Sequence, residues 1–266
     1  MSRKPSKRNR KPDKKAAQQD VTDEEMVIGR NPVLETLKSD RDANKLFIQD
    51  GLAGNKIAGI LDEAKRRKVQ LSFVPKTKLD TLSDGGNHQG VILATSPVNY
   101  ASIDELFEKA EEKKEEPFFI ILDGIEDPHN LGSILRTADA SGAHGVIIPK
   151  RRAVGLTSTV AKASAGAIEH VLVARVTNLS QTIDELKDRG LWIFGTDMKG
   201  KDYRQWDVSS PIGLVIGNEG KGISRLVKEK VDETLSIPMV GNVQSLNAGV
   251  ATGLLMYEVY RKRHSL

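Results

Sequence analysis

The feature that most constrains the fold is the run of apolar residues at 118–122, which contains no polar residue. Such short apolar runs are typical of strands buried on both faces of a parallel sheet. Further strands are predicted at 145–148, 171–174, 192–194, 213–216 and 234–237, with helices between them at 131–140, 157–165, 179–189, 222–230 and 245–262. This alternation predicts an α/β domain with a mostly parallel sheet and helices on both faces. Ligands of such sheets bind in the loops that follow the strands.

A smaller α/β unit precedes this domain. Residues 45–49, 70–74 and 89–94 are predicted strands, residues 56–68 form a predicted helix, and the unit ends near Pro97. Residues 102–116 favour a helix but hold seven acidic residues and three lysines, so we interpret them as a solvated helical connector. We therefore predict a first domain over 26–97, a charged helical connector over 98–116 and a second domain over 117–266.

The net charge of +4 is concentrated in one segment. Residues 1–20 contain eight lysines and arginines against two aspartates, so the remaining chain carries a net charge of −2. A basic segment with so few apolar residues cannot bury enough surface to fold, so residues 1–25 are predicted to be a disordered tail. Such tails can contact nucleic acid through phosphate charge. A tail that only improves solubility is the alternative.

Cysteine is absent, which excludes disulfides, cysteine-ligated metals and thiol nucleophiles. A reducing cytoplasm is the compartment that we expect. No apolar run approaches the roughly 18 residues of a membrane helix, so no membrane partner is expected. The five histidines show no metal-ligand spacing, and no metal site is predicted.

Three loops that follow predicted strands have unusual compositions. In the first, Asn130 is a candidate helix cap, and Arg136 lies about two turns into the following helix. An arginine there could bind a phosphate through two hydrogen bonds, although a plain surface arginine is the alternative.

The second loop, at 216–224, has three glycines and a carboxylate, Glu219, between glycine-rich positions. It matches neither the dinucleotide-binding nor the P-loop pattern, so hydride transfer and ATP hydrolysis are not supported. The third loop, at 237–253, contains the polar residues Gln244, Ser245 and Asn247, with Ser245 as a candidate helix cap. Small residues then follow, which would allow close packing.

The three loops resemble, in order and spacing, the motifs of the SpoU (TrmH) family of RNA ribose 2′-O-methyltransferases. The motifs are Asn130-x-Gly132-x-x-x-Arg136-Thr137, Gly217-Asn-Glu219-Gly220 and Ile237-Pro-Met…Ser245-Leu-Asn247. This resemblance covers residues 118–262. Residues 27–96 resemble the family's N-terminal RNA-binding domain, with signature stretches at 28–33 and 88–91. The layout is most similar to the branch that methylates a guanosine in large-subunit ribosomal RNA.

The resemblance implies a trefoil-knotted C-terminal domain that binds S-adenosylmethionine as methyl donor, a smaller α/β/α RNA-binding domain, and a homodimer formed through the C-terminal domain. The implied catalytic residues are Arg136, Glu219, Asn130, Ser245 and Asn247. The implied cofactor-binding residues are Thr196, Gly217, Asn218, Ile237, Met239 and Leu246. Candidate RNA contacts are Arg30, Asn31 and Gln89.

Two questions stay open at this point. Arg136 is the family's proposed catalytic residue, and its role can be that of a base or that of a fixed charge held by Glu219. The fixed charge agrees with the very high pKa of a guanidinium, which rarely loses its proton. The alternatives to a ribosomal RNA methyltransferase are an enzyme that methylates transfer RNA and a non-catalytic RNA-binding factor for ribosome assembly.

Overall fold

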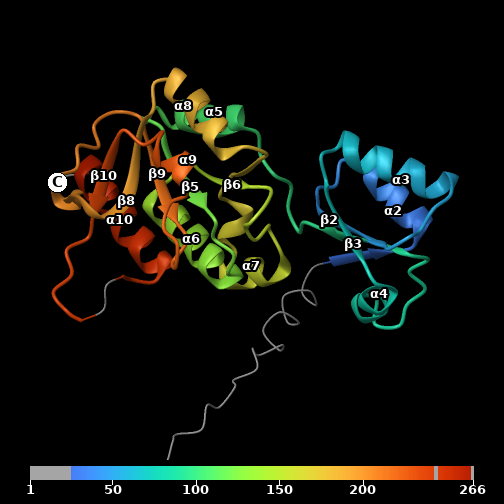
Figure 1. Ribbon diagram of the computed structural model, residues 1–266. Coiled ribbons are helices and arrows are strands. Elements are labelled where there is room, and N and C mark those ends of the chain that lie inside the picture. Colours follow the sequence, from blue (N-terminus) through green and yellow to red (C-terminus); the bar gives the residue numbers. More distant parts are fainter. Residues whose placement is uncertain (1–24, 243–244, 265–266) are drawn as a thin grey trace, which may run out of the picture.

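The computed structural model describes residues 25–242 and 245–264. It contains two sheets, one of four strands and one of six. Figure 1 shows each sheet with its own helices, in two lobes joined by a short connection. We call the elements β1 to β4 the first lobe and α5 to α10 the second lobe. Apart from Glu25, the predicted tail at 1–25 lies outside the described residues, as does Gln244.

The first lobe is an α/β sandwich around a mixed sheet. Its strands lie in the order β1-β4-β2-β3, with β2 and β3 parallel and β4 antiparallel to both β1 and β2. Helices α2 and α3 share one buried cluster with the sheet, and α4 packs on the opposite face. The elements are β1 (Glu25–Ile28), α2 (Arg30–Lys38), β2 (Ala43–Gln49), α3 (Asn55–Arg66), β3 (Gln70–Val74), α4 (Lys76–Leu82) and β4 (Val91–Thr95).

The second lobe has a parallel sheet of six strands in the order β10-β8-β9-β5-β6-β7. Its strands are β5 (Phe118–Asp123), β6 (Gly145–Pro149), β7 (Val173–Val176), β8 (Trp192–Asp202), β9 (Ile212–Gly217) and β10 (Glu233–Ser236). Its helices are α5 (Ile103–Lys113), α6 (Pro128–Ser141), α7 (Ser158–Ala163), α8 (Leu179–Asp188), α9 (Arg225–Lys228) and α10 (Ala248–Arg263), with short 3-10 turns at Ala167–Glu169 and Tyr203–Gln205.

Helices cover both faces of this sheet. Alternate residues of β5 point to opposite sides, so Ile120 packs with α6, α7 and α10, while Ile121 packs with α5, α8 and α9. This confirms the α/β fold class with an unbroken apolar central strand. In the described part of the chain, no helix is long and apolar enough to span a bilayer.

The segment that we interpreted as a solvated connector contains helix α5, and one face of α5 is buried. Leu106 is fully buried and Ala110 nearly so, although the acidic residues on the outer face remain exposed. The ring of Phe107 meets Phe119 edge-on, with centroids 5.0 Å apart. Solvation therefore holds only for the outer face, and α5 packs against the sheet of the second lobe. The many charged residues of this segment drew attention away from its apolar residues at helical spacing, Leu106 and Ala110, which form the buried face.

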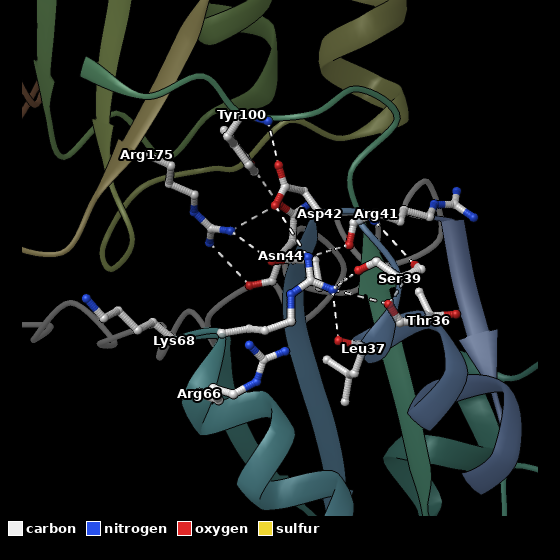
Figure 2. Close-up of polar contacts among 12 residues, drawn as sticks. Thr36, Leu37, Ser39, Arg41, Asp42, Asn44, Arg66, Lys68, Tyr100 and Arg175 are labelled. Carbon is white, nitrogen blue, oxygen red and sulfur yellow. Dashed lines mark hydrogen bonds and ion pairs between the residues drawn. The ribbon is translucent and has the colours of Figure 1, made fainter. Parts of the chain in front are cut away.

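A buried asparagine joins the two lobes. Asn44 of β2 donates from Nδ2 to the carbonyl of Leu156 at 2.9 Å. Its Oδ1 accepts from the hydroxyl of Tyr100 at 2.7 Å and from Arg175 of β7 at 3.2 Å (Figure 2). A Cβ on Gly155 would lie only 2.6 Å from this oxygen, so the close approach requires glycine. These contacts fix β2 against the loop between β6 and α7.

Candidate active site

The first two candidate loops leave neighbouring strands and are tied together. Asp123 and Gly217 are the last paired residues of β5 and β9. A carboxylate oxygen of Asp123 accepts from the backbone N–H of Ser224 at 2.6 Å, and the Gly124 carbonyl accepts from Nδ2 of Asn218 at 2.9 Å. The carboxyl ends of these two strands therefore hold both loops in one place, as expected for a parallel sheet.

The second loop is a tight turn that exposes Glu219. Asn218 and Gly222 exchange backbone hydrogen bonds at 3.1 and 2.8 Å, and Oδ1 of Asn218 accepts from Gly220 N–H at 3.0 Å. A Cβ on Gly217 would lie 2.2 Å from the backbone of Gly222, so the turn closes only over glycine. The side chain of Asn218, a predicted cofactor contact, is engaged in shaping this turn.

Asn130 connects all three loops. It is 8% exposed near the start of α6; its Nδ2 donates to Glu219, and its Oδ1 accepts from Nδ2 of Asn247 at 2.8 Å. Asn247 in turn accepts from the N–H groups of Gly249 and Val250 at 2.9 and 3.3 Å. One amide therefore orients the carboxylate of the second loop and the start of the helix that follows the third.

Two predicted helix caps are wrong. Helix α6 begins at Pro128, and its cap is Asp127, whose carboxylate accepts from the N–H of His129 at 2.9 Å. Helix α10 begins at Ala248, and its cap is Asn247, whereas Ser245 is exposed two residues earlier. Pro128 is favoured at the first helical position, which moves the start of α6 before Asn130. Asn130 is thereby left free for bonds between loops.

Small residues let α10 lie close against α6. A Cβ on Gly249 would lie 3.2 Å from Oγ of Ser133, and one on Gly253 would lie 3.5 Å from Cγ2 of Thr137. The contact at Gly249 is tight and that at Gly253 is an ordinary one, so the missing side chain at Gly249 eases the close approach of the helices near the bond between Asn247 and Asn130.

Arg136 lies on the same helix but outside the hydrogen-bond network. It is exposed, and it makes no hydrogen bond or ion pair within 25–242 and 245–264. The carboxylate of Glu219 accepts a hydrogen bond from Asn130 and none from Arg136 among the described residues. The structure therefore does not show the predicted anchoring of Arg136 by Glu219. The guanidinium is therefore available to a phosphate or to another chain.

The predicted cofactor residues lie around the ends of β8, β9 and β10. Thr196 follows the last residue of β8 that pairs with β9, and its hydroxyl donates to the carbonyl of Val215 at 3.4 Å. Ile237 follows β10 and is half-buried, as is Leu246 before α10, whereas Met239 is 39% exposed. Apolar side chains beside glycine backbone suit the adenosine of S-adenosylmethionine, so the residues fit this cofactor.

The candidate RNA contacts form a separate group on the first lobe. Arg30 donates from its backbone N–H to Oε1 of Gln89 at 3.3 Å and from Nε to the carbonyl of Gln89 at 3.0 Å. Asn31 is exposed and accepts from Nζ of Lys56 at 3.4 Å. Gln89 itself has a φ of 49°, in the left-handed region that few non-glycine residues adopt. These three residues share one surface at the start of α2.

Sequence reasoning missed Asp123, Asp127 and Asn44, which hold the loops and the lobe junction. Asp123 had a signal, because it is the first polar residue after the apolar run of β5. Asn44 had none, since its partners are more than 50 residues away in sequence. In the described residues, no group of three or more histidines or carboxylates is placed to hold a metal ion.

Comparison with known proteins agrees with this geometry. Residues 117–257 match the SpoU rRNA Methylase family, and residues 26–101 match the substrate-binding domain of RNA 2′-O ribose methyltransferases. The Bacillus subtilis (strain 168) protein YacO, whose name assigns it provisionally to the TrmH family of tRNA/rRNA methyltransferases, is 57% identical over 239 residues, covering 90% of this chain and 96% of its own. A Staphylococcus epidermidis relative of the same description is 56% identical over 242 residues, covering 91% and 97%.

Solved structures share the fold. The SpoU methyltransferase AviRb from Streptomyces viridochromogenes, in complex with AdoMet, is 24% identical with a TM-score of 0.59, covering 94% of this chain and 98% of its own. The AdoMet-bound rRNA methyltransferase from Sinorhizobium meliloti is 25% identical with a TM-score of 0.55, covering 95% and 92%. The fold and the three joined loops define an RNA methyltransferase. The chain belongs to the SpoU rRNA Methylase family, which confirms the resemblance.

Proposed function

We propose that the protein transfers a methyl group from S-adenosylmethionine to a ribose 2′-hydroxyl of RNA, and that its substrate is a guanosine of large-subunit ribosomal RNA. One observation carries the proposal. Asn130 bonds both Glu219 and Asn247, while Arg136 lies six residues further along α6, about 9 Å along the helix axis, and is exposed. A fixed carboxylate and an unpaired guanidinium are suited to a hydroxyl and its flanking phosphate.

Methyl transfer requires activation of the nucleophile, the ribose 2′-hydroxyl. A ribose hydroxyl is a poor nucleophile at neutral pH, so the developing alkoxide needs a hydrogen-bond acceptor for its proton or positive charge nearby. S-adenosylmethionine, when bound, supplies the electrophilic methyl group, so no metal is required. The guanidinium of Arg136 acts by its positive charge. Glu219, held by Asn130, orients the hydroxyl, and Ser245 and Asn247 border the same space.

The cofactor lies, in this proposal, between the glycine turn of the second loop and the third loop. Gly217 and the Asn218 backbone form one wall, and Thr196, Ile237, Met239 and Leu246 form the apolar side. The trefoil knot that this pocket implies stays a prediction. So does the division into an RNA-substrate domain over 26–97, a connector over 98–116 and a methyltransferase domain over 117–266.

A homodimer is part of the proposal. Helix α10 exposes Val250, Tyr257 and Tyr260, which recur at helical spacing and are 57%, 49% and 42% exposed. Large apolar and aromatic residues aligned on one helix face are typical of an interface. A second copy docked on this face would bury them. Arg136, on the neighbouring helix, is then close to the interface between the two copies.

RNA is the partner that the first lobe supports. Its match to a substrate-binding domain and the exposed group of Arg30, Asn31 and Gln89 favour contact with RNA there. The basic residues of the tail add phosphate affinity. A substrate in the ribosome also places the enzyme in the cytoplasm, which we keep as part of the proposal.

Substrate choice is tested by label transfer. Protein is incubated with methyl-labelled S-adenosylmethionine and either large-subunit ribosomal RNA or bulk transfer RNA from a strain that lacks the gene, with Arg136→Ala alongside. The proposal predicts label in ribosomal RNA with the wild type alone. Label in transfer RNA alone would show that the substrate is transfer RNA and would contradict the proposed ribosomal RNA substrate. Binding of RNA without label in either RNA would indicate the non-catalytic factor and contradict the proposal.

A further inference from the structure

A basic pocket of about 160 Å³ lies where the two lobes meet. The first lobe contributes Arg67 and Lys68, which follow α3, and the second contributes Lys150 after β6 and Arg175 of β7. Asp42 is the single acidic residue of the lining. Figure 2 shows Arg175 and Lys68 reaching this region from opposite lobes. The volume is several times the roughly 30 Å³ share of a water molecule, which leaves room for a phosphate group.

The two arginines are held in place mainly by backbone carbonyl groups, and Arg67 also forms a long ion pair with Asp42. Arg67 donates to the backbone carbonyls of Ser39 at 2.8 Å and Arg41 at 2.9 Å, and its nearest carboxylate, that of Asp42, is 3.8 Å away. Arg175 donates to the carbonyl of Asn44 at 3.2 Å, and its buried Nε has no hydrogen-bond partner among the described residues. Carbonyl groups orient a guanidinium but leave its full positive charge in the pocket.

The two lysines add uncompensated charge. Neither Lys68 nor Lys150 makes an ion pair in the part of the chain that the structure describes, and Nζ of Lys150 lies 3.5 Å from the carbonyl of Lys68. Burial lowers the pKa of the Lys150 ammonium, and the nearby charges of Arg175 and Lys68 lower that pKa further. Four cations therefore face one carboxylate. A cavity lined by one sign of charge concentrates counter-ions, so an anion bound there would relieve the repulsion.

A second pocket borders the junction pocket. This second pocket has a volume of about 310 Å³ and shares Arg175 with the first. Its lining includes the cations Lys45 of β2 and Arg152, one carboxylate, Glu126, and Pro128. Pro128 is the first residue of α6, the helix that carries Asn130 and Arg136. A chain with regularly spaced phosphates could therefore run from the lobe junction to the start of α6.

We propose that the junction pocket binds a backbone phosphate of the RNA substrate, which Lys68 and Lys150 contact directly. Arg67 and Arg175 act as fixed positive charges behind them. This inference rests on the proposed function, since it takes RNA as the occupant. Phosphate contacts fix the position of a strand and carry no sequence information. The site therefore holds the strand where it passes from the first lobe to the catalytic loops.

The test compares matched double variants of the full chain. Lys68→Ala/Lys150→Ala removes two charges from the pocket, while Lys113→Ala/Lys114→Ala removes two exposed charges at the end of α5. The affinity for a fluorescent single-stranded RNA of mixed sequence is measured over a range of salt concentrations. Each phosphate contact that is lost reduces the salt slope by about 0.7 on single strands, so the pocket variant, which loses one phosphate, should have a slope smaller by about 0.7. We expect its Kd at low salt to rise roughly tenfold.

Two further readouts separate the possible failures. Lys68→Arg/Lys150→Arg should restore most of the slope, because charge rather than shape is required, and thermal unfolding checks that each variant folds. An equal slope in the pocket variant and the α5 variant would overturn the inference. Methyl transfer by the wild type is scored separately. Transfer to neither RNA would remove the proposed function, whereas the slope measures phosphate contact alone.

Discussion

The amide nitrogen of Asn130 donates a hydrogen bond to the carboxylate of Glu219, a residue 89 positions further along the chain. The oxygen of the same amide accepts from Asn247, 117 positions further along. With both ends of the amide engaged, its orientation is fixed, and so is that of the carboxylate. A single buried side chain therefore joins the three motifs of this chain.

Replacing the hydrogen-bond donor of the Asn130 amide by an acceptor should inactivate the site. Asn130→Asp keeps the shape but places a carboxylate against Glu219, so we expect kcat to fall at least a hundredfold. The free energy of unfolding should fall by about 1–3 kcal/mol, the usual cost of a buried polar group left unsatisfied. Methyl-transfer kinetics and urea unfolding measure the two effects.

The control is Asn178→Asp. Asn178 caps α8 by accepting from the N–H of Gln181 at 3.3 Å, and an aspartate accepts equally well. This variant should retain wild-type kinetics. Full activity in Asn130→Asp would show that the link between the motifs is dispensable.

Arg136→Ala should abolish methyl transfer while leaving the fold and cofactor affinity unchanged. The side chain is exposed and makes no bond in the described residues, so the free energy of unfolding should change by less than about 0.5 kcal/mol. Loss of a charge that acts on the developing alkoxide should cost at least about a hundredfold in kcat. Calorimetric titration with S-adenosylmethionine and single-turnover assays measure both quantities. Arg225→Ala, which removes an exposed arginine of α9, is the matched control, and a comparable loss there would contradict a specific role for Arg136.

The exposed face of α10 should set the oligomeric state. Tyr257→Glu places a charge in the middle of this face, and we expect sedimentation to show a monomer with little activity. Phe73→Glu introduces the same charge at a residue of β3 that is 58% exposed, and it should leave a dimer. Sedimentation of the wild-type protein as a monomer would contradict the proposed dimer interface on α10.

The buried position of His144 predicts that the folded protein loses stability in acid. Its ring is buried, its Nδ1 accepts from the N–H of Phe118 at 3.0 Å, and its Nε2 lies 3.1 Å from the carboxylate of Glu115. Burial penalises the cation and lowers the pKa of His144 to about 4, with Glu115 offsetting part of the shift. Below about pH 6.5 the unfolded chain takes up a proton that the folded chain refuses until about pH 4. Stability from this residue is therefore complete above pH 6.5 and falls by up to about 3 kcal/mol as the pH drops to 4.

Urea unfolding between pH 7 and 4 measures this dependence. His144→Asn keeps an acceptor for Phe118 and cannot be protonated, so its stability should vary less with pH over that range. His170→Asn, at an exposed position, should behave as the wild type does. Identical pH profiles for wild type and His144→Asn would refute the assignment.

Much of the fold follows from local pattern. The strand at Gln70–Val74 was predicted with its observed bounds, and the apolar run at 118–122 differs from β5 by one residue, because apolar content alone marks a buried strand. Two elements deviate for reasons beyond their own residues. Helix α9 begins only at Arg225, since Asn218 and Gly222 close a turn first. Strand β8 runs on to Asp202, where Gly200 lies against the backbone of β10.

The candidate site also has features that the sequence predicts and features that it does not. Motif order placed Asn130, Glu219 and Asn247 in one site, and the structure shows them hydrogen-bonded together. The direction of these bonds could not be predicted, because Asp127 rather than Asn130 caps α6 and so frees Asn130. The junction pocket was also missed. Its four cations come from three separate segments, and nothing in the order of the chain places them together.

The central claim is that the methyl group reaches a ribose hydroxyl, and alkaline hydrolysis tests it directly. Ribosomal RNA labelled by the wild-type protein and methyl-labelled S-adenosylmethionine is hydrolysed in alkali, which cleaves the chain only where a free 2′-hydroxyl is present. Our account predicts that the label is recovered in an alkali-resistant dinucleotide whose first nucleoside is guanosine. Label recovered in a mononucleotide would place the methyl group on a base and contradict the account.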